Sequence, residues 1–91
     1  MTARLSDLAA SFETRGDTSI DITSVTEDSR TVEPGALFAA VTGTADDGRR
    51  YIGDALARGA AAVAVERAED APDTLPAVIV PSARHALAEL A

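Results

Sequence analysis

Ninety-one residues allow a single domain, residues 1–91, that would bury about 65% of the surface of its unfolded chain. The formal net charge of -7 argues against nucleic acid as a partner, because binding to phosphates requires a basic face, and it argues equally against a polybasic membrane contact. The sequence contains no cysteine, which excludes disulfides, zinc thiolate sites and thiol catalysis.

The first residues predict a protein of the cytoplasm. Residues 1–12 contain no long apolar stretch and are interrupted by Asp7, so we expect neither a signal peptide nor a membrane span. Many of the apolar residues of the whole chain are alanine, which predicts a thin core. We expect a domain of this kind to be marginally stable and to rely on a neighbouring domain or a ligand.

The first predicted element is a short amphipathic helix that ends before Gly16 and Asp17. Its apolar residues follow helical spacing: Leu5, Leu8, Ala9 and Phe12. β-branched residues between threonines and serines then predict one or two short strands over residues 20–25. These strands lead into a polar cluster, Glu27-Asp28-Ser29-Arg30.

A tight turn follows at residues 33–36. Pro34 fixes φ at the second turn position, and Gly35 can adopt the positive φ that a type II turn requires at the third. The continuous apolar run over residues 37–41 predicts a strand buried on both faces.

This strand leads to a loop over residues 43–48, which has glycine at both ends and no apolar periodicity. A helix is predicted to start at the loop, because Ile52, Ala55 and Leu56 recur at helical spacing. Gly59 is expected to end this helix in the left-handed conformation.

The remaining elements are a buried strand over residues 60–66, an acidic surface loop over 67–76, and a strand over 77–80. Ser82 is the predicted N-cap of a last helix that contains Leu87 and Leu90. This alternation predicts an α/β fold with a small open, mostly parallel sheet flanked by helices. The strands on either side of the Pro34-Gly35 turn are linked too tightly for a usual parallel crossover, which leaves a mixed sheet open.

A strand end, a loop and the start of a helix meet in this arrangement, which is a usual ligand position in α/β folds. The sequence has no GxxxxGK[ST] nucleotide loop, no His, Asp and Glu cluster at metal-ligand spacing, and no nucleophile with a base nearby. We therefore expect no catalytic residue and no metal ligand in this chain.

The segment DSRTVEPGALFAAVTGTADDGRRYI, followed by ALARGAAAVAVE, resembles the N-terminal domain of the Mur ligases of peptidoglycan synthesis. Within that family it resembles most the MurE type, UDP-N-acetylmuramoyl-tripeptide synthetase. The resemblance covers about residues 20–82 well and the first helix loosely, and its most specific parts are the DSR triplet, the PG-x-LF turn and strand, and the DGRRYI helix start. It implies a Mur ligase N-terminal domain fold that binds the UDP part of UDP-N-acetylmuramoyl-L-alanyl-D-glutamate.

The resemblance also implies a longer enzyme, with a central ATPase domain and a C-terminal domain that are absent from this chain. With ATP and Mg²⁺, such a ligase activates a substrate carboxylate as an acyl phosphate and adds the third residue of the stem peptide, meso-diaminopimelate or L-lysine. By this resemblance the present domain binds no cofactor, is not catalytic in isolation, and has the ATPase domain of its own chain as a partner.

Substrate contacts follow from the position of residues within the motifs. The resemblance implies contacts from Ser29, Glu27, Thr44, Ala45 and Asp46, with Arg30 and Gly43 in support. Relatives often carry a leucine-like residue in place of Glu27, and histidine or asparagine in place of Thr44 and Ala45. Because a carboxylate repels a diphosphate, we expect Glu27 to contribute its backbone.

The residues themselves leave alternatives open. The Ser29 hydroxyl suits a ribose, a uracil edge or a phosphate, but it can also stabilise a turn. Arg30 can bind a phosphate, although the nearby Asp28 favours an internal ion pair that fixes the turn. Asp46 and Asp47 suit a helix start yet would repel a diphosphate there, so we expect phosphate contacts through Ser29 and loop amides.

Four further residues have simpler interpretations. Arg49 and Arg50 either offset the repulsion by the aspartates or are solvated surface charges. We interpret Tyr51 as a packing residue with its hydroxyl at the surface rather than a stacking platform for uracil. The only histidine, His85, has no partner in view and is not expected to be catalytic.

Three alternative functions remain. Within the family, the MurF type adds D-Ala-D-Ala and has similar DSR and DG regions. Outside it, the chain could be a stand-alone nucleotide-sugar-binding module without ligase activity. It could also be a structural α/β interaction domain that docks through an apolar surface.

Overall fold

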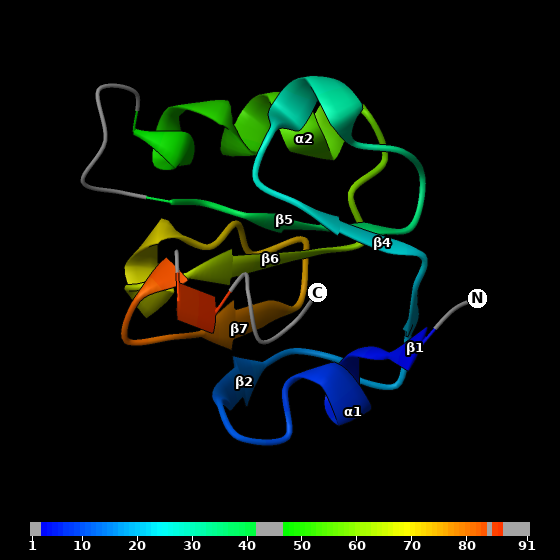
Figure 1. Ribbon diagram of the computed structural model, residues 1–91, viewed down its shortest axis with the longest axis vertical. Helices are drawn as coiled ribbons and strands as arrows, with labels where there is room; N and C mark the ends of the chain where they lie inside the picture. Colours follow the sequence, from blue (N-terminus) through cyan, green and yellow to red (C-terminus); the bar gives the residue numbers. More distant parts are fainter. Residues whose placement is uncertain (1–2, 42–46, 84, 87–91) are drawn as a thin grey trace.

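The computed structural model describes residues 3–41, 47–83 and 85–86. Within these residues a five-stranded sheet forms the centre (Figure 1), in the order β2 (Glu13–Arg15), β7 (Ala77–Ile79), β6 (Ala62–Val65), β5 (Ala36–Ala39) and β4 (Ser24–Thr26). The strands β4 to β7 are parallel to their neighbours, and β2 pairs with β7 in the antiparallel direction. A separate antiparallel pair is formed by β1 (Ala3–Arg4) and β3 (Asp21–Ile22). The prediction of a small open, mostly parallel sheet is confirmed, and the sheet is mixed.

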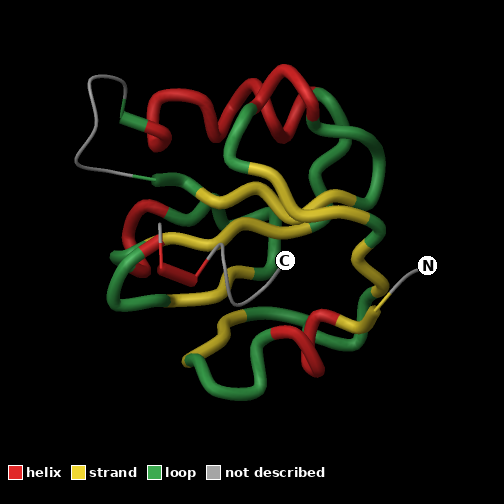
Figure 2. Tube along the Cα trace, viewed as in Figure 1, coloured by secondary structure: helices red, strands yellow, loops and turns green. Residues whose placement is uncertain are grey.

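Apolar clusters on both faces of the sheet hold the fold together. Successive strand residues point to opposite faces, so Leu37 and Phe38 belong to different clusters. The face that Phe38 joins is covered by α2 (Ile52–Ala57), which buries Ile52 and Ala55 there. Figure 2 shows α2 on one side of the sheet and the short N-terminal helix on the other.

The opposite face is covered by α1 (Leu5–Leu8) and by the first residues of a C-terminal helix. Leu5, Leu37 and Ala83 are fully buried in this cluster. All of residues 36–41 are buried, which confirms the expectation of a strand shielded on both faces. The strand itself runs from Ala36 to Ala39, slightly earlier than the predicted 37–41.

Three connections between parallel neighbours contain 3-10 turns: η1 (Ser29–Thr31), η2 (Gly48–Tyr51) and η3 (Ala68–Asp70). Each connection contributes to the cluster on the α2 face, through Val32, Ile52 and Leu75 respectively. Successive crossovers over one face are expected where the order of parallel strands does not reverse.

The tight link between β4 and β5 is nevertheless parallel, so the expectation that it could break the parallel pattern is wrong. Residues 27–35 suffice because β4 is only three residues long, and the returning chain has little distance to cover. The return ends beside the start of β4, where Thr23 N donates to Gly35 O at 3.0 Å.

The predicted turn at residues 33–36 is confirmed. Gly35 has φ +92°, and Ala36 N donates to Glu33 O at 3.0 Å. Gly59 ends α2 with φ +98°, as predicted, and its carbonyl accepts a hydrogen bond from Gly35 N at 3.0 Å. The two glycines therefore join the turn to the end of the helix.

Two predictions for the N-terminal region need correction. The first helix spans only Leu5–Leu8, because the chain leaves helical geometry at Ala9, although Phe12 still packs against the same cluster. The strand β2 was not predicted, since its residues are all exposed and polar and give no apolar signal. It is an edge strand, held by pairing with β7 rather than by burial.

The last predicted elements agree with the structure where it describes them. Residues 67–76 form a surface connection that includes η3, and Ser82 caps the next helix by accepting a hydrogen bond from His85 N at 3.4 Å. The loop residues 43–46, Leu87 and Leu90 lie outside the described residues.

Among the helices of the described residues, none is long and apolar enough to cross a membrane.

Candidate functional site

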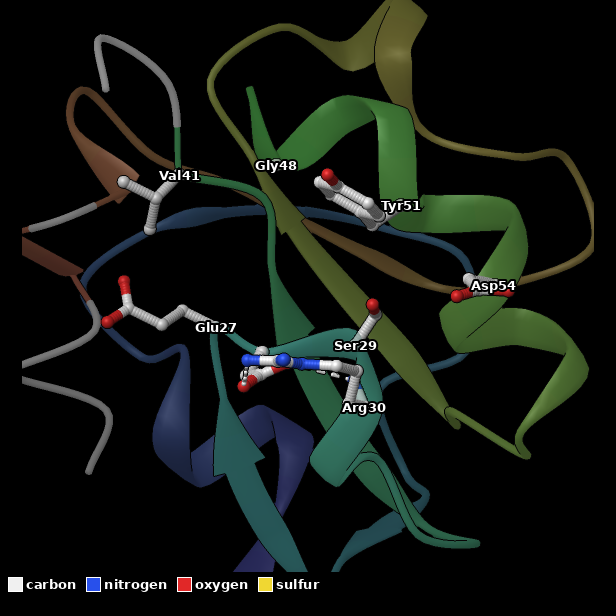
Figure 3. Close-up of a pocket in the computed structure, with 8 residues that line it drawn as sticks. Glu27, Ser29, Arg30, Val41, Gly48, Tyr51 and Asp54 are labelled. Atoms are coloured by element: carbon white, nitrogen blue, oxygen red, sulfur yellow. Dashed lines mark hydrogen bonds and ion pairs between the residues drawn. The ribbon is translucent and has the colours of Figure 1, made fainter. Parts of the chain in front are cut away.

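A cleft of about 460 Å³ opens at the carboxyl ends of β4 and β5, beside the start of η2. Its position agrees with the rule that ligands of open α/β sheets bind at the carboxyl ends of parallel strands. Figure 3 shows the side chains around it, which come from the β4–η1 connection, the end of β5 and the η2–α2 segment. The lining residues are Glu27, Asp28, Ser29, Arg30, Val41, Gly48, Tyr51 and Asp54.

Ser29 is the buried polar residue of the described core, with only 6% of its surface exposed. It is the first residue of η1, and its carbonyl accepts a hydrogen bond from Val32 N. Its hydroxyl has no hydrogen-bond partner among the described residues and points into the cleft, toward the side that Tyr51 and Asp54 occupy (Figure 3). A buried hydroxyl that faces a cleft in this way can both donate to and accept from a ligand.

The turn that carries Ser29 is fixed by Asp28 and Arg30. Asp28 Oδ1 accepts hydrogen bonds from Arg30 N at 2.9 Å and Nε at 3.0 Å, and Oδ2 accepts one from Nη2 at 2.9 Å. The side-chain hydrogen bond and then the backbone hydrogen bond from Arg30 lower the pKa of Asp28 from 3.8 to about 2. The predicted internal ion pair is therefore confirmed. Arg30 retains further N–H donors, because the guanidinium carries five and Asp28 takes two.

Two threonines support the same turn. Thr26 Oγ1 accepts a hydrogen bond from Asp28 N at 3.1 Å, and Thr31 Oγ1 donates to Asp28 O at 2.9 Å. The two hydroxyl oxygens lie 2.7 Å apart. Backbone and side chains of residues 26–31 thus hold Ser29 in one position before any ligand arrives.

The other wall of the cleft is formed where η2 approaches the end of β5. Gly48 N donates to Val41 O at 2.8 Å, and the backbones are so close that a Cβ at Gly48 would lie 2.6 Å from Val41 N. A residue without a side chain at position 48 therefore permits this close approach of the two backbones.

Ionic contacts fix the start of η2. Asp47 caps it by accepting a hydrogen bond from Arg49 N at 3.0 Å and also pairs with the Arg49 guanidinium. The side-chain and backbone hydrogen bonds from Arg49 lower the pKa of Asp47. Arg49 also reaches Asp70 Oδ2 at 3.6 Å, so it serves the fold rather than the cleft, and Arg50 is exposed.

The structure brings together part of the predicted site. Glu27, Ser29 and Arg30 all line the cleft. The other predicted contacts, Thr44, Ala45, Asp46 and the supporting Gly43, lie outside the described residues. His85 is exposed and does not line the cleft.

Val41 and Asp54 line the cleft but were not predicted to do so. Tyr51 packs against the apolar cluster, as predicted, and also lines the cleft. A signal for Asp54 exists in the sequence, since it follows Tyr51 by three residues and so shares its face of the helix. Only the packing of α2 against η1 makes that face a wall of the cleft.

A second, smaller cavity of about 240 Å³ lies away from this cleft, between β2 and the residues around η3. Arg15, Asp73 and Leu75 are among its lining residues. The described residues contain no group of three or more His, Cys, Asp or Glu side chains that could hold a metal ion.

An open α/β sheet with a polar cleft at the carboxyl ends of its parallel strands is the arrangement in which α/β domains usually bind their ligands. The family model described as "Mur ligase family, catalytic domain" matches residues 21–91. The chain belongs to the Mur ligase family.

Curated relatives place the chain near the MurE type. The UDP-N-acetylmuramoyl-L-alanyl-D-glutamate--2,6-diaminopimelate ligase of Chlorobaculum tepidum is 48% identical over 97% of this chain and 19% of that protein. The UDP-N-acetylmuramyl-tripeptide synthetase of Deinococcus radiodurans is 42% identical over 97% of this chain and 19% of that protein. The chain therefore spans about a fifth of the length of these relatives.

Solved structures support the fold. A crystal structure of MurF from Acinetobacter baumannii superposes with a TM-score of 0.81 at 26% identity, covering 99% of this chain and 20% of that chain. The predicted Mur ligase N-terminal domain fold is thereby confirmed.

Proposed function

We propose that this chain is the N-terminal substrate-binding domain of a MurE-type ligase and binds the UDP part of UDP-N-acetylmuramoyl-L-alanyl-D-glutamate. The longer enzyme would be cytoplasmic and would add the third residue of the peptidoglycan stem peptide. The names of the curated relatives support this reaction, and the family match supports the class of enzyme.

The observation that carries the proposal is the buried hydroxyl of Ser29, which has no partner among the described residues and lies in a cleft at the carboxyl edge of the sheet. We assign substrate contacts to Ser29 and to the backbone of Glu27, with Arg30 in support through the N–H groups that Asp28 leaves open. From the motif, we further assign contacts to Thr44, Ala45 and Asp46, supported by Gly43.

The ATP and Mg²⁺ of the reaction are assigned to a central domain beyond this chain. Among the described residues, no group of three or more potential metal ligands supports a Mg²⁺ site. The part of the domain in catalysis is to hold the nucleotide end of the substrate while its carboxylate is activated elsewhere. A central ATPase domain of the same polypeptide is the partner that this division of labour requires.

The MurF type is the second candidate, because the solved MurF structures match nearly the whole chain. Their identity to this chain is 25–26%, whereas the 2,6-diaminopimelate ligase of Chlorobaculum tepidum is 48% identical over 97% of the chain. Sequence similarity therefore favours the MurE type.

Binding of UDP by the 91-residue chain and its Ser29→Ala variant tests the proposal. We expect Ser29→Ala to weaken UDP binding about two- to thirteenfold, the effect of losing one hydrogen bond of about 0.5–1.5 kcal/mol. Ser24→Ala is the matched control, because Ser24 is exposed on β4 and does not line the cleft. Equal affinities of the wild type and Ser29→Ala, or no UDP binding at millimolar concentrations, would count against the proposal.

A further inference from the structure

The described walls of the cleft carry more negative than positive charge. Glu27, Asp28 and Asp54 line it together with Arg30, and Arg30 is already bonded to Asp28 through Nε and Nη2. Within the described part of the chain, Glu27 and Asp54 have no side-chain hydrogen bond or ion pair. Two exposed carboxylate side chains of the cleft lining therefore have no bonded cation among the described residues, although the charge of Arg58 acts on the neighbouring Asp28.

This charge has the wrong sign for a diphosphate. Like charges a few ångströms apart repel each other, and they do so more strongly in a cleft than in open solvent. An ionised carboxylate is instead a pure acceptor that binds O–H and N–H donors. The walls thus suit the uncharged part of a nucleotide, whose sugar hydroxyls and ring N–H groups are such donors.

We propose that Asp54 is a further substrate-contacting residue, whose carboxylate accepts a hydrogen bond from a neutral donor of the nucleoside end of the ligand. The diphosphate then lies outside the walls formed by the described residues. This inference rests on the proposed function and adds to it which end of the ligand the cleft holds.

The surroundings of Asp54 support this role. It lies on α2, which packs directly against η1, so its carboxylate and the Ser29 hydroxyl come from opposing elements. Figure 3 shows the Ser29 hydroxyl pointing toward the side of the cleft that Tyr51 and Asp54 occupy. Ser29 is 94% buried, and its hydroxyl, which can donate and accept, has no partner among the described residues. The Asp54 carboxylate, which can only accept, belongs to the same cleft lining.

A purely structural role for Asp54 is the competing explanation. An acidic residue in the first turn of a helix stabilises it through the helix dipole, and Asp54 is in the first turn of α2. Such a role would lower the stability of Asp54→Asn without changing which ligands bind.

The test compares uridine with UDP on the wild type, Asp54→Asn and the control Asp73→Asn, at low and high NaCl concentration. Asp73→Asn changes the net charge equally but lies at the second cavity. We expect Asp54→Asn to weaken uridine and UDP by the same factor, about three- to tenfold, with little dependence on salt. Asp73→Asn should bind both ligands as the wild type does. Urea unfolding of each variant measures any loss of stability separately.

The other outcomes overturn the inference in distinguishable ways. Tighter UDP binding by Asp54→Asn at low salt would place the diphosphate, not the nucleoside, beside Asp54. Unchanged affinity for both ligands would assign Asp54 to the helix alone. A wild type that binds UDP but not uridine would refute only this inference, whereas a wild type that binds neither would refute the proposed function as well.

Discussion

Gly48 is the position at which the cleft leaves no room for a side chain. A Cβ there would lie 2.6 Å from Val41 N, 2.9 Å from Val41 O and 3.0 Å from Ala40 C, all of them backbone atoms. The chain cannot simply move apart, because Gly48 N donates to Val41 O at 2.8 Å. Gly48→Ala should therefore cost about 1–3 kcal/mol, the usual range for forcing an atom into a packed site.

Gly53 provides the matched control. It also belongs to the η2–α2 segment, but it is exposed, and a Cβ there would meet nothing within 4 Å. Because alanine favours the helix over glycine, Gly53→Ala should stabilise the domain by about 0.5–1 kcal/mol.

Urea unfolding measures both effects. With a slope of about 1 kcal/mol per molar urea, the midpoint should fall by about 1–3 M for Gly48→Ala and rise by about 0.5–1 M for Gly53→Ala. UDP affinity should fall only in Gly48→Ala, since only that change moves a wall of the cleft. A Gly48→Ala variant as stable as Gly53→Ala would refute the close approach of η2 to the end of β5.

Three further predictions concern the turn and the core. The Asp28 carboxyl should titrate near pH 2 in ¹³C NMR, since its pKa is lowered to about 2. The stability that this carboxylate contributes is present above pH 3.8 and is lost as the pH falls through 2. A titration midpoint near pH 4 would show that the Arg30 contact does not persist. Phe38→Ala should cost about 3–5 kcal/mol and leave much of the protein unfolded by circular dichroism, whereas the partly buried Phe12→Ala should cost less; the reverse order would contradict the packing. Gly59→Ala should destabilise by about 1–2 kcal/mol in urea, because Gly59 has φ +98° and Pro34 Cα would lie 3.1 Å from the new Cβ; an unchanged midpoint would contradict this geometry.

Local chemistry made much of the fold predictable from the sequence. Pro34 and Gly35 determine their turn through the φ values they allow, and Gly59 ends its helix for the same reason. The residues of β5 are buried on both faces, which their continuous apolar run already indicated. The turn bond between Asp28 and Arg30 was likewise predictable, since residues two positions apart can meet within one turn.

The remainder depended on contacts between distant segments. Strand β2 carries no apolar signal and exists because β7 offers it an edge. The parallel link from β4 to β5 escaped prediction because its feasibility depends on how short β4 is in the folded chain. Asp54 became a cleft residue only through the packing of α2 against η1, which spacing along the chain does not specify.

The most direct test of the account follows backbone amide NMR shifts during titration with UDP-N-acetylmuramoyl-L-alanyl-D-glutamate. The account predicts saturable shifts at residues 27–30 and 48–54, with none at Arg15 and Leu75 around the second cavity, which serves as an internal control. Shifts confined to the second cavity, or no shifts in a demonstrably folded domain, would contradict the assignment of the cleft as the nucleotide site.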